Sequence, residues 1–549
     1  MRVRADSTSR KVGGVGGADS VAIVPAAVAL SSVLMKNDSA TPGAPIAGSS
    51  TDRVYAELVR QVAEELWPGD QLPTTRSLVR RFQVSPITVQ HALNRLAQEG
   101  LVFTRPGHGT FVAERRERRA GVDHGWQAVV LGPSPTGLDE FHEVLAPSRP
   151  GVLPLGSGYL DTDAQPFGAL ASAMARAARR SGGWDRVPPE GVEALRAWFA
   201  RQLGDASADD VSIVPGGQAA LSTIFRSLAA PGAPVLVESP AHLGTLAALR
   251  AQGFRAVPVP TDADGVRPDL LEAAFLASGA RVFACQPTYA NPTGATLPAD
   301  RRDAVLGIAR RLGAFIVEDD AARDLAIDGL PPPPLAARDD GHVVYVRSLT
   351  KPAAPGLRLA AVCARGPVSV RLRTEAVVSD LFVAGPMQEA ALGLVCSPAW
   401  ARHLRALRSV LRARRDAAVQ AVREHLPQVR LDVVPEGGFV LWLRLPEGVD
   451  EVGFARACAD RSVQVNPGRA WFPAEPEPGF VRLSYAAASA DAVRLGIARM
   501  GEILRATVGG PPGAALTRRS AAEAQAAPRR RDPAGRPAAR GRTRPPRGP

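Results

Sequence analysis

Between about residues 151 and 507, short apolar runs of strand length alternate with longer segments of helical periodicity. The apolar runs include VLVE at 235–238, VFAC at 282–285, FIVED at 315–319 and VVYV at 343–346. This alternation is typical of an α/β domain built on a mostly parallel sheet. Such sheets bind ligands at the carboxyl ends of their strands. The polar residues that follow these runs are therefore the first candidates for a functional site.

Length, charge and cysteine content set further bounds. The 549 residues correspond to about three or four domain-sized units, and the 45% hydrophobic content excludes wholesale disorder. Residues 511–549 hold ten arginines against two acidic residues, so they carry +8 of the formal net charge of +12. We expect the Arg/Pro/Ala-rich tail at 508–549 to be disordered, either as a solubilising segment or as a salt-sensitive attraction for nucleic acid. The four cysteines show no paired or metal-type spacing, which argues against a disulfide scaffold and a structural zinc site and favours a reducing compartment.

Residues 51–114 are predicted to form a small unit of three helices and a hairpin. Apolar residues recur at helical spacing over 55–66, and a second, shorter helix is expected after Pro73. Two predicted strands, 101–104 and 110–113, are joined by a glycine-containing turn. Three helices followed by a hairpin indicate a winged helix-turn-helix. The alternative is a small helical cap with a solvated polar face.

The third predicted helix presents polar side chains. Ser85 suits its N-cap and Pro86 its first position, where a missing N–H costs nothing. Its buried stripe is expected to consist of Val89, Ala92, Leu93 and Leu96. The residues expected to face outward are Thr88, Gln90, His91, Asn94 and Arg95. Such a face of hydrogen-bond donors and acceptors suits base edges and phosphates.

The string PGDQLPTTRSLVRRFQVSPITVQHALNRLAQEGLVFTRPGHGTFV, at 68–112, resembles the DNA-binding domain of the GntR superfamily. The resemblance implies binding to a double-stranded DNA operator, usually as a dimer, with Arg76, Thr88 and Gly107 at DNA-contacting positions. By residue type, Arg80 and Arg81 are expected to contact phosphates, although either is also compatible with a solvated charge. The full set of expected DNA-binding residues is Arg76, Arg80, Arg81, Ser85, Thr88, Gln90, His91, Gly107 and His108.

Two further segments lie outside the predicted folded units. Residues 1–50 contain an apolar stretch at 21–35 that is too short to span a membrane. The basic residues before it and the small residues at 27–29 leave a secretory signal open. Because the next unit must meet DNA, we favour a disordered or mis-assigned extension, with Met35 as the true start. Residues 115–150 are expected to be a mostly irregular linker.

Four motifs of the large unit follow predicted strands or open helices. VPGGQAAL at 214–221 is a glycine turn that can offer backbone N–H groups to a phosphate, although close helix packing explains it equally well. QPTYANPTG at 286–294 forms a sharp turn. The acidic run at 318–320 ends a buried strand, which is costly unless a cation lies nearby. SLTKPAAPGLR at 348–358 contains Lys351.

Lys351 is notable because lysine is scarce in this chain. Lys11 and Lys36 are the only others, and arginine supplies the positive charge elsewhere. A lysine at this place indicates an amine that must lose its proton, since arginine cannot form a Schiff base.

Together these motifs resemble a fold-type I pyridoxal-phosphate site of the class I and II aminotransferases. The resemblance implies that Lys351 is the catalytic residue that forms a Schiff base with the cofactor, that Asp319 pairs with the pyridine nitrogen and that Asn291 bonds the ring oxygen. The other cofactor-binding positions it implies are the ring-stacking His242 and the phosphate-binding Gly217, Gln218, Ser348 and Arg358. Arg482, in VRLSY at 481–485, matches the arginine that binds a substrate or effector carboxylate, for which a guanidinium fork is suited.

Two positions depart from that family. After the aspartates it usually places a tyrosine that contacts the ring oxygen, but here Ala321, Ala322 and Arg323 follow. In ESPAH, His242 stands where an aromatic residue, often tyrosine, stacks on the ring; the alternative is an ordinary surface histidine. Loss of the tyrosine removes a group that tunes the cofactor, so we expect at most partial or weak transaminase activity.

A winged helix joined to an aminotransferase-like domain resembles the MocR subfamily of GntR regulators, over residues 51–507. This architecture implies a cytoplasmic, homodimeric, pyridoxal-phosphate-dependent transcription factor that senses an amino acid or related amine. It implies neither a metal ion nor a membrane. The alternative is a catalytically active aminotransferase with a fused helix-turn-helix domain.

Overall fold

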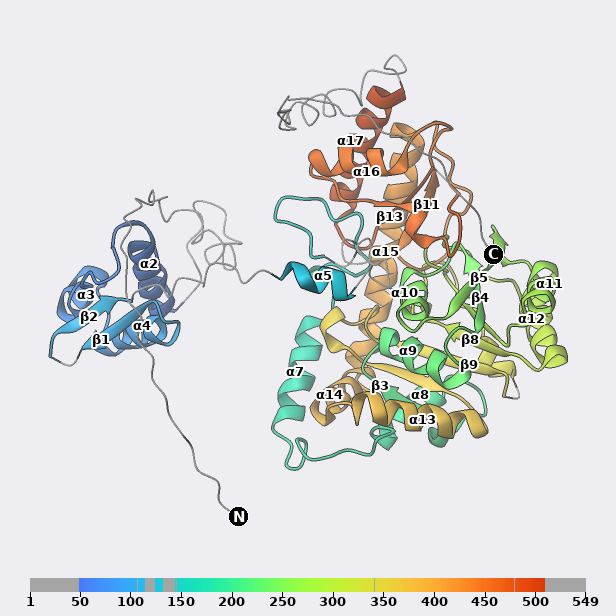
Figure 1. Ribbon diagram of the computed structural model, residues 1–549, viewed down its shortest axis with the longest axis horizontal. Helices are drawn as coiled ribbons and strands as arrows, with labels where there is room; N and C mark the ends of the chain where they lie inside the picture. The colour runs from blue at the N-terminus through green and yellow to red at the C-terminus, as the bar shows by residue number, and fades with distance from the viewer. Residues whose placement is uncertain are drawn as a thin grey trace, which may run out of the picture. The chain divides into compact units, whose positions relative to one another are not determined.

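The computed structural model describes residues 49–105, 107–113, 124–131, 144, 146–339, 341–477 and 479–508. The chain forms two compact units, Met1–Gly132 and Pro133–Pro549, and each is described by itself (Figure 1). The predictions for the N-terminal extension, for most of the linker and for the basic tail fall on residues outside those described. None of the helices in the described part of the chain combines the length and apolar content that crossing a bilayer requires.

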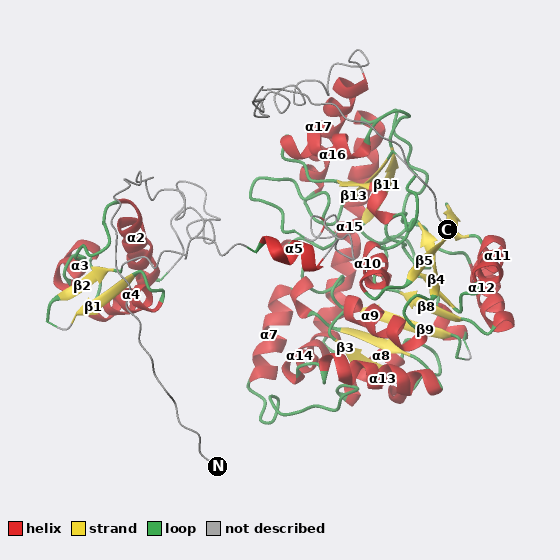
Figure 2. Ribbon diagram, viewed as in Figure 1, coloured by secondary structure: helices red, strands yellow, loops and turns green. Residues whose placement is uncertain are grey.

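The first unit has three helices followed by an antiparallel hairpin, which is the predicted order (Figure 2). Its elements are α2 (Ser50–Glu64), α3 (Thr75–Phe82), α4 (Pro86–Gln98), β1 (Val102–Arg105) and β2 (Gly109–Val112). In the hairpin Val102 lies opposite Val112. A short helix, α5 (Gly125–Leu131), lies in the segment predicted to be a mostly irregular linker. The run WQAVVL contains neither glycine nor proline, so nothing in it interrupts a helix.

Side-chain caps set the helix starts of this unit. Ser49 and Asp52 form a capping box at α2, and Thr74 accepts a hydrogen bond from a first-turn N–H of α3. Ser85 does the same at α4, with Pro86 in the first position, as the sequence predicts. The predicted buried stripe of α4 is confirmed: Val89, Ala92, Leu93 and Leu96 are all buried.

The second unit is built on an eight-stranded sheet of order β3-β10-β9-β8-β7-β4-β5-β6. Its strands are β3 (Val211–Val214), β4 (Pro234–Ser239), β5 (Arg255–Asp262), β6 (Gly265–Val266), β7 (Val282–Cys285), β8 (Phe315–Asp319), β9 (Val343–Ser348) and β10 (Ala360–Cys363). The central neighbours β5, β4, β7, β8 and β9 are parallel, whereas β10 runs antiparallel to both β9 and β3. The mostly parallel sheet predicted from the alternation is therefore confirmed.

Helices cover both faces of this sheet (Figure 2). They are α7 (Phe167–Ala178), α8 (Glu193–Ala200), α9 (Gly217–Leu228), α10 (Leu243–Ala251), α11 (Pro268–Ser278), α12 (Ala299–Leu312), α13 (Pro367–Asp380) and α14 (Gly385–Val395). On one face α9, α10 and α13 share a core with Val237 and Val317. On the other face α11 and α12 share a core with Leu236 and Ile316. Successive residues of a strand point to opposite faces of the sheet. Neighbouring residues at a strand end therefore point to opposite sides.

A three-stranded antiparallel sheet forms the rest of the unit, in the order β11-β13-β12. Its strands are β11 (Val440–Arg444), β12 (Asn466–Pro467) and β13 (Phe480–Ser484). The helices of this region are α15 (Pro398–His425), α16 (Glu451–Asp460) and α17 (Ala490–Val508). They bury a separate apolar core against the small sheet, which includes Leu441, Val481 and Ile497. This packing fixes β13, the strand that carries Arg482.

Candidate functional site

Strand ends of the large sheet open into a cavity of about 490 Å³. That volume suits a cofactor together with a small ligand. All nine residues predicted to bind the cofactor and a carboxylate line it: Gly217, Gln218, His242, Asn291, Asp319, Ser348, Lys351, Arg358 and Arg482. They come from segments far apart in the sequence, which the sheet topology brings to one edge.

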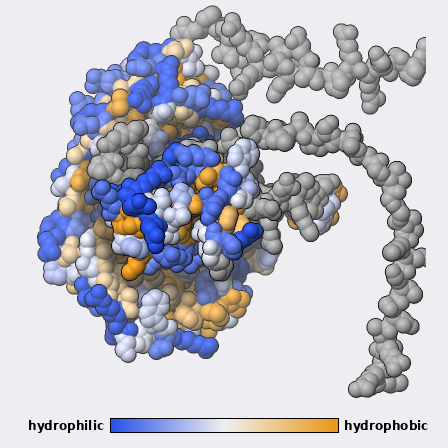
Figure 3. All heavy atoms as spheres, turned by 90° about the vertical axis from the view of Figure 1, so that its left-hand side faces the viewer, coloured by the Kyte–Doolittle hydropathy of each residue, from blue (hydrophilic) through white to orange (hydrophobic). Residues whose placement is uncertain are grey.

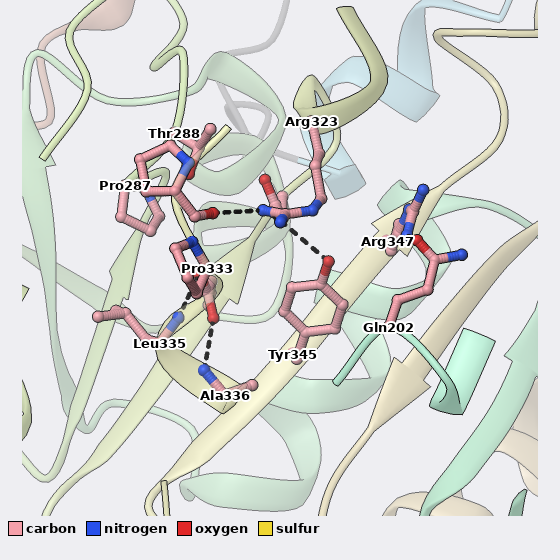
Figure 4. A network of polar contacts seen from close by, with 12 residues as sticks. Gln202, Pro287, Thr288, Arg323, Pro333, Leu335, Ala336, Tyr345 and Arg347 are labelled. Atoms are coloured by element: carbon pink, nitrogen blue, oxygen red, sulfur yellow. Dashed lines mark hydrogen bonds and ion pairs between the residues drawn. The ribbon is translucent and has the colours of Figure 1, made fainter. Parts of the chain in front are cut away.

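The acidic run at the end of β8 divides between the two faces of the sheet. Glu318 and Asp320 are buried and do not line the cavity. Figure 4 labels the residues with which they interact: Leu335, Ala336, Tyr345 and Arg323. Glu318 accepts hydrogen bonds of 3.0 Å each from two backbone N–H groups, of Leu335 and Ala336. Asp320 accepts a 2.9 Å hydrogen bond from the Tyr345 hydroxyl and forms a 3.2 Å ion pair with Arg323. The sequence suggested that this acidic run lies beside a cation. For Asp320 that cation is Arg323.

Asp319 remains available to a ligand. Its Oδ2 accepts a 2.7 Å hydrogen bond from Nε2 of Gln286, whereas its buried Oδ1 has no partner among the described residues. Burial raises the pKa of Asp319 to about 6. A buried acceptor without a donor is costly, so this atom is suited to a ligand that brings an N–H group.

Gln286 is a site residue to which sequence reasoning gave no role. Besides bonding Asp319, it accepts a 2.9 Å hydrogen bond at Oε1 from the backbone N–H of Asn291. Its own backbone N–H donates to Glu238 at 2.9 Å, and burial raises the pKa of that carboxyl to about 7. Gln286 thus orients Asp319 and Asn291 at once. The available signal was its place in QPTYANPTG, directly after β7.

Lys351 follows β9 and extends into the cavity. Its Nζ donates a 2.7 Å hydrogen bond to the carbonyl oxygen of Gly158, and it lies 4.3 Å from the ring centre of Tyr159 and 4.9 Å from that of Phe439. Burial, and then the nearby Arg482, lower the pKa of Lys351 to about 7. A substantial fraction of this amine is therefore neutral, and so nucleophilic, at neutral pH.

One end of the cavity is shaped for an anion. Helix α9 begins at Gly217, so its first backbone N–H groups lack intrahelical partners. Gly216 has a φ of 102°, and a Cβ there would lie 2.7 Å from Nη2 of Arg358. The chain therefore needs glycine for the close approach of this guanidinium to the helix start. Ser348, whose Cβ lies 3.9 Å from the position that a Cβ on Gly217 would take, and Gln218 complete this end of the lining.

Arg482, on β13, supplies a buried cation at another part of the cavity lining. It is only 2% exposed, and it donates hydrogen bonds to Asn291 Oδ1 at 2.9 Å, Gly156 O at 3.0 Å and Asn466 Oδ1 at 2.9 Å. All three acceptors are neutral, and no carboxylate of the described residues forms an ion pair with it. Burial lowers the pKa of Arg482 to about 9. A buried, uncompensated guanidinium demands an anionic ligand.

Asn291 and His242 complete the predicted ring-binding set. Because Asn291 Oδ1 accepts from Arg482, its amide N–H₂ is the group left for a ring oxygen. His242 caps α10, and its Nδ1 lies 3.7 Å from Asp319 Oδ2. Burial lowers the pKa of His242 to about 3, so the imidazole is neutral and the contact is not an ion pair. Ala321 and Ala322 line the cavity in place of the tyrosine found in the family.

The predicted DNA-binding residues gather on α3, α4 and the hairpin turn. Thr88 is half-buried, and the other eight are exposed: Arg76, Arg80, Arg81, Ser85, Gln90, His91, Gly107 and His108. Gly107 has a φ of 78°, which suits the glycine-dependent turn. Arg81 forms a 2.8 Å ion pair with Glu57, whereas Arg80 makes no hydrogen bond or ion pair within the described part of the chain. The two arginines, predicted as equivalent, thus stand in different surroundings.

Both units match known protein families. Residues 150–500 match the family described as Aminotransferase class I and II. Residues 50–112 match the family described as Bacterial regulatory proteins, gntR family.

Relatives and solved structures extend these matches. The chain is 30% identical to the HTH-type transcriptional regulator YjiR of Escherichia coli (strain K12), over 82% of this chain and 98% of that protein. It is 27% identical to the HTH-type transcriptional regulator YdfD of Bacillus subtilis (strain 168), over 82% of this chain and 96% of that protein. A crystal structure of LysN, the α-aminoadipate aminotransferase of Thermus thermophilus complexed with N-(5'-phosphopyridoxyl)-L-leucine, superposes with a TM-score of 0.65 at 28% identity, covering 68% of this chain and 96% of that one.

Proposed function

Because this chain belongs to the class I and II aminotransferase family and carries a gntR-family domain ahead of it, we propose that it is a MocR-type transcriptional regulator. In this proposal residues 51–114 bind operator DNA in the cytoplasm, and residues 151–507 bind pyridoxal phosphate and sense an amino acid or related amine. The observation that carries the proposal is the cavity itself. It combines an amine with a pKa near neutrality, an unpaired carboxylate oxygen and two separate cations, in a chain that also has a winged helix.

The aminotransferase family implies pyridoxal phosphate as the cofactor, and the described residues fit it. Asp319 Oδ1 is a buried acceptor for which the described residues supply no donor, and the glycine at 216 leaves space for Arg358 beside the start of α9. When bound, pyridoxal phosphate supplies an aldehyde that links covalently to an amine and a pyridine ring that withdraws electrons.

Each of these side chains would then have a separate role. Lys351 provides the neutral amine for the covalent link, and Asp319 keeps a proton on the ring nitrogen. Gly217, Gln218, Ser348 and Arg358 would hold the phosphate, and His242 would pack its neutral ring against the cofactor. Asn291 would donate to the ring oxygen, and Arg482 would bind the carboxylate of the effector.

Sensing requires only that the effector's amine displace that of Lys351, and full turnover is not needed. Ala321, Ala322 and Arg323 stand where the family usually places a tyrosine at the ring oxygen, and the missing phenol favours a sensor over an efficient enzyme. The alternative, a working aminotransferase with a fused helix-turn-helix domain, is favoured by one observation: all nine predicted site residues line one cavity.

Exposed apolar side chains support a homodimer. On the face turned to the viewer in Figure 3, hydrophilic spheres predominate and hydrophobic ones form small groups. Yet the second unit exposes Phe167, at the start of α7, by 77%, Trp184 by 74% and Val378, on α13, by 78%. Exposed apolar residues mark an interaction surface where they form a contiguous patch, whereas singly exposed ones are ordinary. A second copy of the chain would cover them in an isologous contact.

A DNA-binding assay tests the proposed function. The full-length protein, loaded with cofactor, is titrated against DNA fragments that flank its own gene, with and without a panel of amino acids. We expect binding to one fragment and a change in affinity when an amino acid is present, because an effector must prefer one arrangement of the regulator. Robust turnover of common amino donors, together with no binding to any flanking fragment, would establish the enzyme alternative instead.

Arg80 offers a sharper test of the DNA-facing surface. We expect Arg80→Ala to weaken binding to all sequences alike and to reduce the slope of log affinity against log salt by about one unit, because one phosphate contact is lost. The matched control is Arg81→Ala, since Arg81 is already paired with Glu57 and its loss should change the slope less. Equal slopes for Arg80→Ala and the unaltered protein would remove Arg80 from the phosphate-contacting set. Fluorescence anisotropy at several salt concentrations measures the slope for both variants and for the unaltered protein.

A further inference from the structure

Three aromatic rings surround the two groups that would hold an amino acid. The Lys351 Nζ lies 4.3 Å from the ring centre of Tyr159 and 4.9 Å from that of Phe439. The Arg482 guanidinium carbon lies 5.7 Å from the ring centre of Phe439 and 5.3 Å from that of Trp471. The space between amine and guanidinium is therefore bounded by aromatic faces.

Further apolar side chains extend this wall. Leu243 and Val144 line the same cavity, and they form one packed cluster with Trp471. Ala321 and Ala322 also line the cavity, and their small side chains leave space there. The part of the cavity not needed for the cofactor is thus mostly hydrocarbon in character.

Each charged group that the described residues bring to the cavity already has a proposed role. Among its described lining residues the charged groups are Lys351, Arg358, Arg482 and Asp319, since the imidazole of His242 is neutral. Arg358 faces the phosphate end, Asp319 the ring nitrogen, and Lys351 is the amine that the ligand replaces. Arg482 balances one carboxylate. No described lining residue is left to pair with a second carboxylate or with a side-chain ammonium.

From this balance we infer that the effector is an α-amino acid whose side chain is uncharged and largely apolar, and that Tyr159, Phe439 and Trp471 form its side-chain wall. The inference rests on the proposed function, because it takes the cavity to be an effector site. An acidic or basic side chain would be buried without a partner, which costs roughly tenfold to hundredfold in affinity.

Ligand titration of the full-length, cofactor-loaded protein tests the inference. L-leucine, L-methionine and L-phenylalanine are compared with L-glutamate, L-2-aminoadipate and L-lysine, and binding is followed by the visible circular dichroism of the cofactor and by the shift of operator DNA. We expect the apolar amino acids to bind at least about tenfold more tightly than the charged ones. If a charged amino acid binds as tightly or more tightly, the inference fails while the proposed function stands. If no amino acid changes either signal, the proposed function itself fails.

A substitution in the wall gives an independent check. Tyr159 is half-buried, so Tyr159→Arg can place a cation in the wall without replacing a core residue. We expect this variant to gain about tenfold or more for L-glutamate relative to L-leucine, whereas the control Tyr159→Phe, which keeps the ring, should retain the original order. Val144→Arg serves as a second variant at another half-buried position of the wall. An unchanged order of ligands in both arginine variants, each still binding the cofactor, would contradict the placement of the side-chain wall.

Discussion

Replacing Lys351 by alanine is expected to abolish covalent retention of the cofactor while DNA binding persists. The reason is that Lys351 is the only lysine among the described residues that line the cavity, and no arginine can form the link. After cofactor loading, borohydride reduction and denaturation, the mass of the unaltered chain should include the cofactor, and that of Lys351→Ala should not. Operator binding without effector should change little, because the altered residue lies in the other compact unit from the winged helix.

Lys351→Arg is the matched control, because it keeps a positive charge in the cavity but lacks a reactive amine. Like the alanine variant, it should retain no cofactor after denaturation. In the unaltered protein, the rate of cofactor capture should rise as the pH increases through about 7, the pKa to which burial lowers this amine from its usual 10.5. The sign follows from the chemistry, since only the neutral amine attacks and its fraction rises as the pH passes through that pKa and levels off above it. A capture rate that keeps rising toward pH 10 would show an ordinary, solvated lysine. Cofactor fixed at another residue would contradict the role of Lys351, and loss of DNA binding in both variants would contradict separable modules.

The sequence predicted the elements whose signals are local. The cap at Ser85, the buried stripe of α4 and the apolar runs of β4, β7, β8 and β9 each follow from neighbouring residues, and the structure bears them out. The mostly parallel sheet also followed, because strands that alternate with helices leave few other arrangements.

What sequence reasoning missed depends on contacts between distant segments. The run at 318–320 looked like a single acidic cluster, but successive strand residues point to opposite faces, so Asp319 lines the cavity while Glu318 and Asp320 bond to Leu335 and Tyr345. Nothing in the sequence showed that Arg323, beside the missing tyrosine, neutralises Asp320. The role of Gln286 depends on β7 lying beside β8, a pairing of strands that only the fold settles.

Replacing Arg482 by methionine is expected to remove the response to the carboxylate of the effector. Arg482 is a buried cation without an anionic partner among the described residues, so a ligand carboxylate gains a charge-assisted, desolvated contact there. Losing such a contact costs about 2–5 kcal/mol, which corresponds to roughly 30-fold or more in affinity. Cofactor retention should persist, since Lys351 is unchanged, and it also reports that the variant is folded.

A pair of ligands isolates this contact from the side-chain wall. L-alanine and ethylamine share an amine and a small apolar group but differ by one carboxylate, so the ratio of their affinities measures the carboxylate contact alone. The unaltered protein should prefer L-alanine by roughly 30-fold or more, and Arg482→Met should bind the two about equally. The preference of Arg482→Lys for L-alanine should lie between those of the unaltered protein and Arg482→Met, because a point charge remains but the bidentate fork is lost. If the preference for L-alanine survives in Arg482→Met, another group binds the carboxylate, and the buried charge of Arg482 then serves the packing of Asn291 and Asn466 instead.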